Sequence, residues 1–221
     1  MTSFRITALA GVAMLALSAS AASAQLGRQQ GLVEPNVAPD SAILALPHVT
    51  PALLDAIKAS RPILSATVLD SIATASSLDK AQRTTLYGKM FVHVDLNRGT
   101  DAELLLIPGM NQARVDAIKA GRPWKSFEQL QAQLGKTAAT PAEVARLEQY
   151  LFIPIELNTW TDPIMDSFAS INVGTPRWKR EFAEYRPWTS MEQFDREISK
   201  YLRSRPQELK RLARYVYIEK K

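Results

Sequence analysis

The chain contains the octapeptide DAIKASRP at Asp55–Pro62 and nearly the same octapeptide, DAIKAGRP, at Asp116–Pro123. Corresponding positions lie 61 residues apart, and seven of the eight letters agree. Each copy is typical of the second half of a helix, in which Ile57 or Ile118 faces a core and the neighbouring aspartate and lysine point outward. The Arg-Pro pair then ends the helix, because proline cannot continue it. The repetition predicts a fold built from repeated supersecondary units.

The same offset of 61 aligns positions on both sides of the octapeptide, and a third, more divergent copy follows at offsets of 61 to 64. The aligned positions include Asn36 with Asn97, Leu46-Pro47 with Ile107-Pro108, Phe91 with Phe152, and Arg122-Pro123-Trp124 with Arg186-Pro187-Trp188. We therefore predict three divergent repeats of about 61 residues, over residues 36–96, 97–157 and 158–221.

The sequence pattern of each repeat predicts a set of short helices. In the middle copy, Thr100 followed by Glu103 forms a capping box, and a second helix is predicted from about Gln112 to Ala120. Ser126 and Thr140 mark two further helix starts. The predicted fold class is all-α, with strand content near zero.

The first residues have the pattern of a secretory signal peptide. One charge, Arg5, precedes the apolar run Ile6–Leu17, and Ala22-Ser23-Ala24 provides a cleavage site, which assigns 1–24 to the signal and 25–35 to a linker. The alternative is an uncleaved membrane anchor, although a span needs roughly 20 apolar residues. The chain contains no Cys. We expect a periplasmic protein with no stable membrane span after cleavage.

Charge is unevenly distributed among the copies. Residues 36–96 hold five Lys/Arg and five Asp/Glu, and residues 97–157 hold seven of each. Residues 158–221 hold thirteen Lys/Arg and nine Asp/Glu, a net charge of +4. The third copy is therefore the part of the chain that can attract a polyanion.

The stretch VDLNRGTDAELLLIPGMNQARVDAIKAGRPWKSFEQL, residues 94–130, resembles the helix-hairpin-helix domain of ComEA-type DNA-uptake proteins. The resemblance rests on Asp95-Leu96-Asn97, Thr100, Glu103-Leu104, Ile107-Pro108-Gly109-Met110, Ala113, Ala117-Ile118, Arg122, Phe127-Glu128 and Leu130. It implies that backbone N–H groups at the hairpin contact phosphates of double-stranded DNA without reading the sequence.

The family's hairpin is usually Gly-hydrophobic-Gly, and no copy has both glycines. The three hairpins are His48-Val49-Thr50, Gly109-Met110-Asn111 and Asn172-Val173-Gly174, and we expect the first to bind nothing. The resemblance and the nearby charges together predict nucleic-acid contacts from Gly109, Met110, Asn111, Arg114, Lys119, Asn172, Val173, Gly174, Arg177, Lys179 and Arg180.

Each of these residue types also has an alternative interpretation. The cations of the third copy, which continue through Arg203, Arg205, Lys210, Arg211 and Arg214, either contact phosphate or form solvated helix faces. The tryptophans either stack on bases or fill the cores, as Trp124 and Trp188 would after Arg-Pro. His48 and His93 are the only histidines, and no catalytic constellation, metal site or cofactor site is expected.

Two functions follow as hypotheses. The first is non-catalytic, sequence-independent binding of double-stranded DNA in the periplasm, with a part in DNA uptake implied by the resemblance. The second is a periplasmic scaffold or adaptor whose hairpins have lost DNA binding and contact other periplasmic or envelope proteins.

Overall fold

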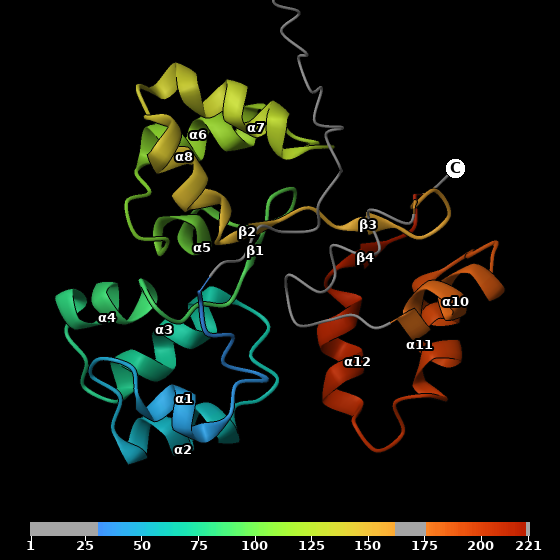
Figure 1. Ribbon diagram of the computed structural model, residues 1–221, viewed down its shortest axis with the longest axis horizontal. Coiled ribbons are helices and arrows are strands. Elements are labelled where there is room, and N and C mark those ends of the chain that lie inside the picture. Colours follow the sequence, from blue (N-terminus) through green and yellow to red (C-terminus); the bar gives the residue numbers. More distant parts are fainter. Residues whose placement is uncertain (1–30, 162–175, 220–221) are drawn as a thin grey trace, which may run out of the picture.

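The computed structural model describes residues 31–161 and 176–219, so the predicted signal peptide lies outside it. The described chain is mostly helical with very little strand, which confirms the all-α prediction. Its helices form three groups arranged around short central strands (Figure 1). Within the described residues, no helix is long and apolar enough to cross a membrane.

The first group contains α1 (Asp40–Leu44), α2 (Pro51–Ala59), α3 (Ala66–Ala75) and α4 (Lys80–Tyr87). Side chains cap three of these helices. Thr50 accepts from the Leu53 backbone before α2, Ser65 accepts from Thr67 before α3, and Asp79 forms a capping box with Gln82 before α4.

The second group contains α5 (Asp101–Leu105), α6 (Gln112–Ala120), α7 (Phe127–Leu134), the 3-10 turn η1 (Gly135–Thr137) and α8 (Pro141–Glu148). The predicted helix from Gln112 to Ala120 is confirmed. The predicted caps are also present: Thr100 and Thr140 form capping boxes, and Ser126 accepts from the Gln129 backbone.

The third group contains α10 (Pro176–Glu184), α11 (Met191–Ser199) and α12 (Pro206–Ala213). Trp188 lies buried between α10 and α11, with its indole N–H donating to the Phe182 carbonyl at 2.9 Å. Trp124 makes the corresponding bond to the Ile118 carbonyl at 2.9 Å in the second group. These two tryptophans therefore fill cores, as the alternative to base stacking predicted.

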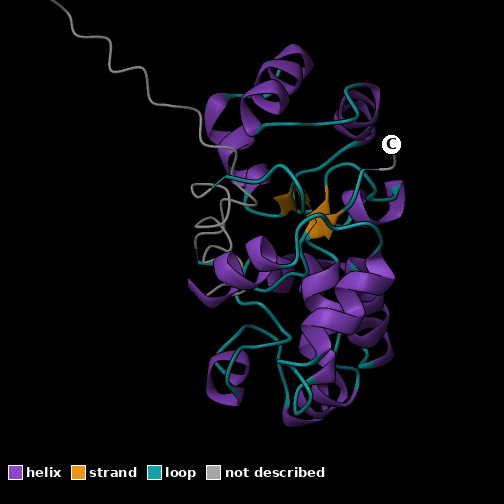
Figure 2. Cartoon of the chain, turned by 90° about the vertical axis from the view of Figure 1, so that its right-hand side faces the viewer, coloured by secondary structure: helices purple, strands orange, loops and turns teal. Residues whose placement is uncertain are grey.

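Short parallel pairings connect the start of each group to its end. Val33 bridges Met90, β1 (Val94–Asp95) pairs with β2 (Leu151–Phe152), and β3 (Ile155–Glu156) pairs with β4 (Val216–Tyr217). The strands lie near the middle of the molecule, with helices on both sides (Figure 2). The first and last residues of each group therefore lie side by side. The strands are too short to form an extended sheet.

The arginine of each Arg-Pro pair fastens the beginning of its group. Arg122 donates from Nε to the Leu96 carbonyl at 2.9 Å and from Nη2 to the Gly99 carbonyl at 2.6 Å. Arg61 and Arg186 make the same two types of bond, to Pro35 and Ala38 and to Leu157 and Trp160. All three Arg-Pro peptide bonds are cis. The arginine therefore has a structural role in addition to ending the helix.

An asparagine near the start of each group completes the attachment. Asn97 accepts from the Trp124 N–H at 2.6 Å and donates to the Trp124 carbonyl at 3.1 Å. Asn36 makes this pair of bonds with Ile63, and Asn158 makes it with Trp188. The asparagine thus satisfies both backbone groups of the residue that follows the cis proline.

The one letter that differs between the octapeptides has a steric cause. A Cβ at Gly121 would lie 2.1 Å from the Trp124 ring, so a larger residue there would require the ring to move. In the first group, Ser60 occupies the corresponding position and Ile63 replaces the tryptophan. The third group has Tyr185 at this position and keeps the tryptophan, with the Tyr185 and Trp188 ring centres 5.8 Å apart, so the glycine suits the packing of Trp124 in the second group alone.

Candidate nucleic-acid interface

The hairpin of the second group runs from Ile107 to Asn111, between α5 and α6. Gly109 has φ +80°, which L side chains rarely adopt, and the Met110 N–H donates to the Ile107 carbonyl at 2.9 Å. Asn111, the last residue of this hairpin, is the N-cap of α6 and accepts from the Arg114 N–H at 3.0 Å. This asparagine already satisfies one of the N–H groups at the start of α6.

The Arg114 side chain, a predicted nucleic-acid contact, turns back toward this hairpin and is buried. Its Nη1 donates to the Gly109 carbonyl at 2.7 Å, and its Nη2 pairs with Glu143 at 3.0 Å. Hydrogen bonds from the Thr140 backbone and from Arg114 lower the pKa of Glu143 to about 2. Arg114 therefore ties the hairpin to the start of α8.

A second arginine, Arg146 of α8, lies over the same hairpin and donates to the Pro108 carbonyl. A Cβ on Gly109 would be 2.2 Å from Arg146 Nη2, so the glycine permits this close approach. Sequence reasoning did not identify Arg146, because it lies 38 residues from Pro108 in the chain.

Lys119, another predicted contact, is half-exposed and pairs with Asp101 at 2.8 Å. Its hydrogen bond lowers the pKa of the Asp101 carboxyl. Lys58 and Asp40 make the corresponding pair in the first group at 2.5 Å. These lysines link the first two helices of their groups across the solvent-exposed side.

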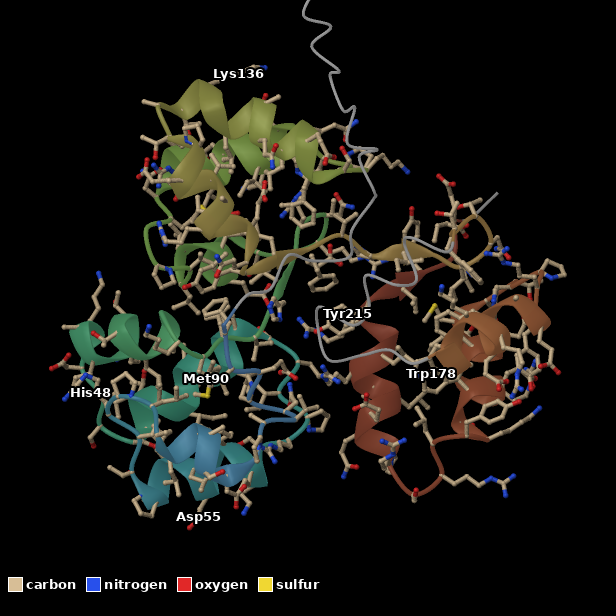
Figure 3. The ribbon with its side chains drawn as sticks, viewed as in Figure 1. His48, Asp55, Met90, Lys136, Trp178 and Tyr215 are labelled. Carbon is tan, nitrogen blue, oxygen red and sulfur yellow. The ribbon has the colours of Figure 1, made fainter. Side chains whose placement is uncertain are left out.

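The first hairpin reproduces the backbone of the second without its glycine. His48 has φ 64° at the position of Gly109, and Thr50 caps α2 as Asn111 caps α6. His48 lies at the outer edge of the first group (Figure 3).

The predicted third hairpin, Asn172-Val173-Gly174, lies outside the described residues, as does the side chain of Arg177. Arg180 extends into solvent, with 76% of its side chain exposed, and pairs with the buried Glu181 at 3.1 Å. That bond raises the pKa of Arg180. Lys179 is half-buried on the same helix. Trp178 on α10 is buried, and Trp160 carries the Arg186 guanidinium 4.3 Å above its ring.

The first and second groups each have a second turn that the sequence analysis did not identify. Ser77 and Ala138 have φ 65° and 56° before α4 and α8, at corresponding positions. The helices that follow are capped by Asp79 and Thr140. The capping motifs alone could have indicated this turn, since Thr140 was already identified as a helix start.

In the third group, the corresponding turn between α11 and α12 is basic. Arg205 takes the N-cap position of α12 and makes no side-chain cap bond. Arg203, Arg205 and Lys210 are exposed, and no ion pair within the described chain reaches them. Arg203 and Arg205 lie in the turn itself, and Lys210 lies on α12. We call these three residues the basic turn.

Among the residues that the structure describes, no cluster of three or more His, Asp or Glu side chains could hold a metal ion. No protein-family profile, no curated protein and no solved structure matches this chain.

Proposed function

We propose that this chain is an exported, non-catalytic protein of three tandem helix-hairpin-helix repeats, which binds double-stranded DNA without sequence specificity. The proposal includes cleavage of the signal peptide 1–24, a periplasmic location and a part in DNA uptake. The recurring Asn and Arg contacts support the three repeats, since each set connects the same two points of its group.

The basic turn is the feature that most directly supports DNA binding. Its three cations are exposed and lack acidic partners within the described chain, so a phosphate could approach them without breaking an existing ion pair. In the second group, by contrast, Arg114 and Lys119 are already held by Glu143 and Asp101. We therefore assign the main phosphate contacts to the third group, with Arg180 as a further candidate, because its side chain is 76% exposed although it pairs with Glu181.

The rival function is a periplasmic adaptor, and one observation favours it. The cations of the second hairpin hold its own carbonyls and Glu143, which leaves that hairpin suited to a structural role.

Salt-dependent titration of duplex DNA with the chain from Gln25 onward tests the proposal. We expect affinity to fall steeply between about 50 and 200 mM salt. Replacing Arg203 and Arg205 with alanine should reduce the slope of log affinity against log salt by about 2. The matched control replaces Lys58 and Lys119, which removes the same charge from ion-paired positions and should leave the slope unchanged.

Absence of binding at the lowest salt by a folded protein would reject DNA binding and favour the adaptor. Equal effects of the two double variants would instead show that the basic turn is not the contact surface.

A further inference from the structure

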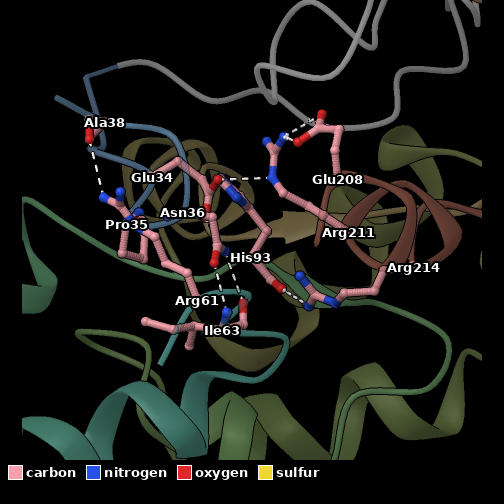
Figure 4. Close-up of polar contacts among 10 residues, drawn as sticks. All are labelled: Glu34, Pro35, Asn36, Ala38, Arg61, Ile63, His93, Glu208, Arg211 and Arg214. Carbon is pink, nitrogen blue, oxygen red and sulfur yellow. Dashed lines mark hydrogen bonds and ion pairs between the residues drawn. The ribbon is translucent and has the colours of Figure 1, made fainter. Parts of the chain in front are cut away.

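Helix α12 is tied to the segment that precedes α1. Arg211 Nε lies 2.9 Å from Glu34 Oε2, and both side chains are only 2% exposed. Arg211 also pairs with Glu208 on its own helix at 3.2 Å. A buried arginine shared by two carboxylates connects the third group to the first (Figure 4).

A second contact lies one turn further along the chain. Arg214 Nη2 donates to the backbone carbonyl of His93 at 2.7 Å, between the first and second groups (Figure 4). The Arg214 guanidinium lies 5.6 Å from the ring centres of Phe152 and Tyr215. Two arginines of the third group are therefore held by the N-terminal half of the chain.

The His93 side chain itself is buried beside these arginines, and neither ring nitrogen has a hydrogen-bond partner of normal geometry. Burial lowers its pKa to about 3, and the nearby charges of Arg214 and Arg211 contribute. The Gln149 backbone acts in the opposite direction. Other titratable groups at this junction include Glu34, Glu208, Asp95, Arg98 and Tyr215.

We propose that Glu34, His93, Arg211 and Arg214 form an acid-released clasp that holds the third helical group against the first. While the imidazole is neutral, the two arginines are balanced by Glu34 and Glu208. A protonated His93 would add a third positive charge to the same buried site. The docked form therefore resists protonation, and acid favours the released form.

The direction and the pH window follow from linkage. A solvated His93 in the released form would have its ordinary pKa of 6.5, whereas the docked value is about 3. Docking is therefore fully retained above pH 6.5 and weakens as pH falls toward 3. The equilibrium constant for docking should be about 25-fold smaller at pH 5 than at pH 7.

The neighbouring titratable side chains do not reverse the weakening of docking at low pH. Burial raises the pKa of Asp95, but its carboxylate accepts from the Asn97 and Arg98 backbone, and both contacts are made without any residue of the third group. Tyr215 is neutral between pH 3 and 7, because burial raises its pKa further above its ordinary value. The clasp does not depend on DNA binding and could be present in either proposed function.

The absence of native cysteine allows a direct distance measurement. Ala81→Cys in the first group and Ser204→Cys in the third are exposed positions for a pair of spectroscopic labels. We would measure the label distance in increasing urea at pH 7, 6 and 5, with the helical circular dichroism signal recorded in parallel. The label distance should increase at lower urea as pH falls, before the helical signal is lost.

His93→Phe should remove this pH dependence between pH 7 and 5, because phenylalanine does not titrate. The matched control, His48→Asn, changes the other histidine and should keep the pH dependence. Glu34→Gln should release the third group at lower urea at pH 7, since Arg211 then lacks its buried carboxylate. The same pH dependence in His93→Phe as in the parent would overturn the proposal.

Titration of the two imidazoles by NMR provides a readout that needs no substitution. The proposal expects the His93 signals not to titrate above pH 4 in the docked protein. A His93 pKa near 6.5 in that state would contradict it.

Discussion

At the residue scale, the hairpin before α2 and the hairpin before α6 place different residues at one backbone conformation. Gly109 has φ +80°, and His48 has φ 64°. The left-handed conformation costs a residue with a Cβ about 1–2 kcal/mol. Gly109 has a second constraint, since a Cβ there would lie 2.2 Å from Arg146 Nη2. The first hairpin therefore carries a local strain that the second avoids.

Opposite substitutions at these two positions should have opposite effects. Gly109→Ala should lower the free energy of unfolding by about 2 kcal/mol, because it adds both backbone strain and contact with Arg146. His48→Gly should raise it by about 0.5 kcal/mol, after the greater entropy of the unfolded chain is subtracted. Urea denaturation followed by circular dichroism measures both. A destabilising His48→Gly would show that the imidazole makes a compensating contact.

At the scale of single elements, the asparagine that binds the residue after each cis proline connects two distant segments. Asn97→Ala should remove both bonds to the Trp124 backbone and leave its N–H and carbonyl unsatisfied. We expect a loss of about 2–3 kcal/mol in the free energy of unfolding. Gln112→Ala, which removes an exposed bond to Asp116, is the control and should cost less than about 0.5 kcal/mol. Equal losses for both variants would exclude a special role for Asn97.

Local elements were predictable from sequence because local chemistry determines them. Thr100, Ser126 and Thr140 cap the helices that their spacing indicated, and α6 has its expected bounds. The direction of Arg114 was not predictable, since it depends on Glu143, 29 residues away. The bonds of Arg122 to carbonyls 26 and 23 residues earlier have the same cause. Of the candidate site, the sequence identified the first two hairpins but not the carboxylates and carbonyls that bind the arginine and lysine side chains of the second.

At the scale of the whole molecule, the described hydrophobic residues divide into two cores. The first runs from Leu32 to Ile153 and is shared by the first and second groups. The second consists of residues of the third group together with Phe152 of β2, and it is rich in aromatic residues, including Phe182 and Phe194. The third group is joined to the others by the polar contacts of α12 with Glu34 and His93 and by the packing of Phe152 on Tyr215, whose ring centres lie 4.5 Å apart. Such a division predicts separate unfolding of the third group.

Phe194→Ala should reveal this division, because it creates a cavity in the aromatic core alone and should cost about 3–5 kcal/mol there. Ile57→Ala should act on the other core, which the first and second groups share. Three of the four tryptophans, Trp160, Trp178 and Trp188, report on the third group, whereas Trp124 belongs to the first core and circular dichroism reports on all helices. Phe194→Ala should therefore move the fluorescence transition to lower urea and leave most of the helical transition in place, and Ile57→Ala should do the reverse. Coincident transitions by both probes in both variants would instead show that the three groups unfold as one cooperative unit. The polar contacts of α12 would then couple the cores more strongly than their chemistry indicates.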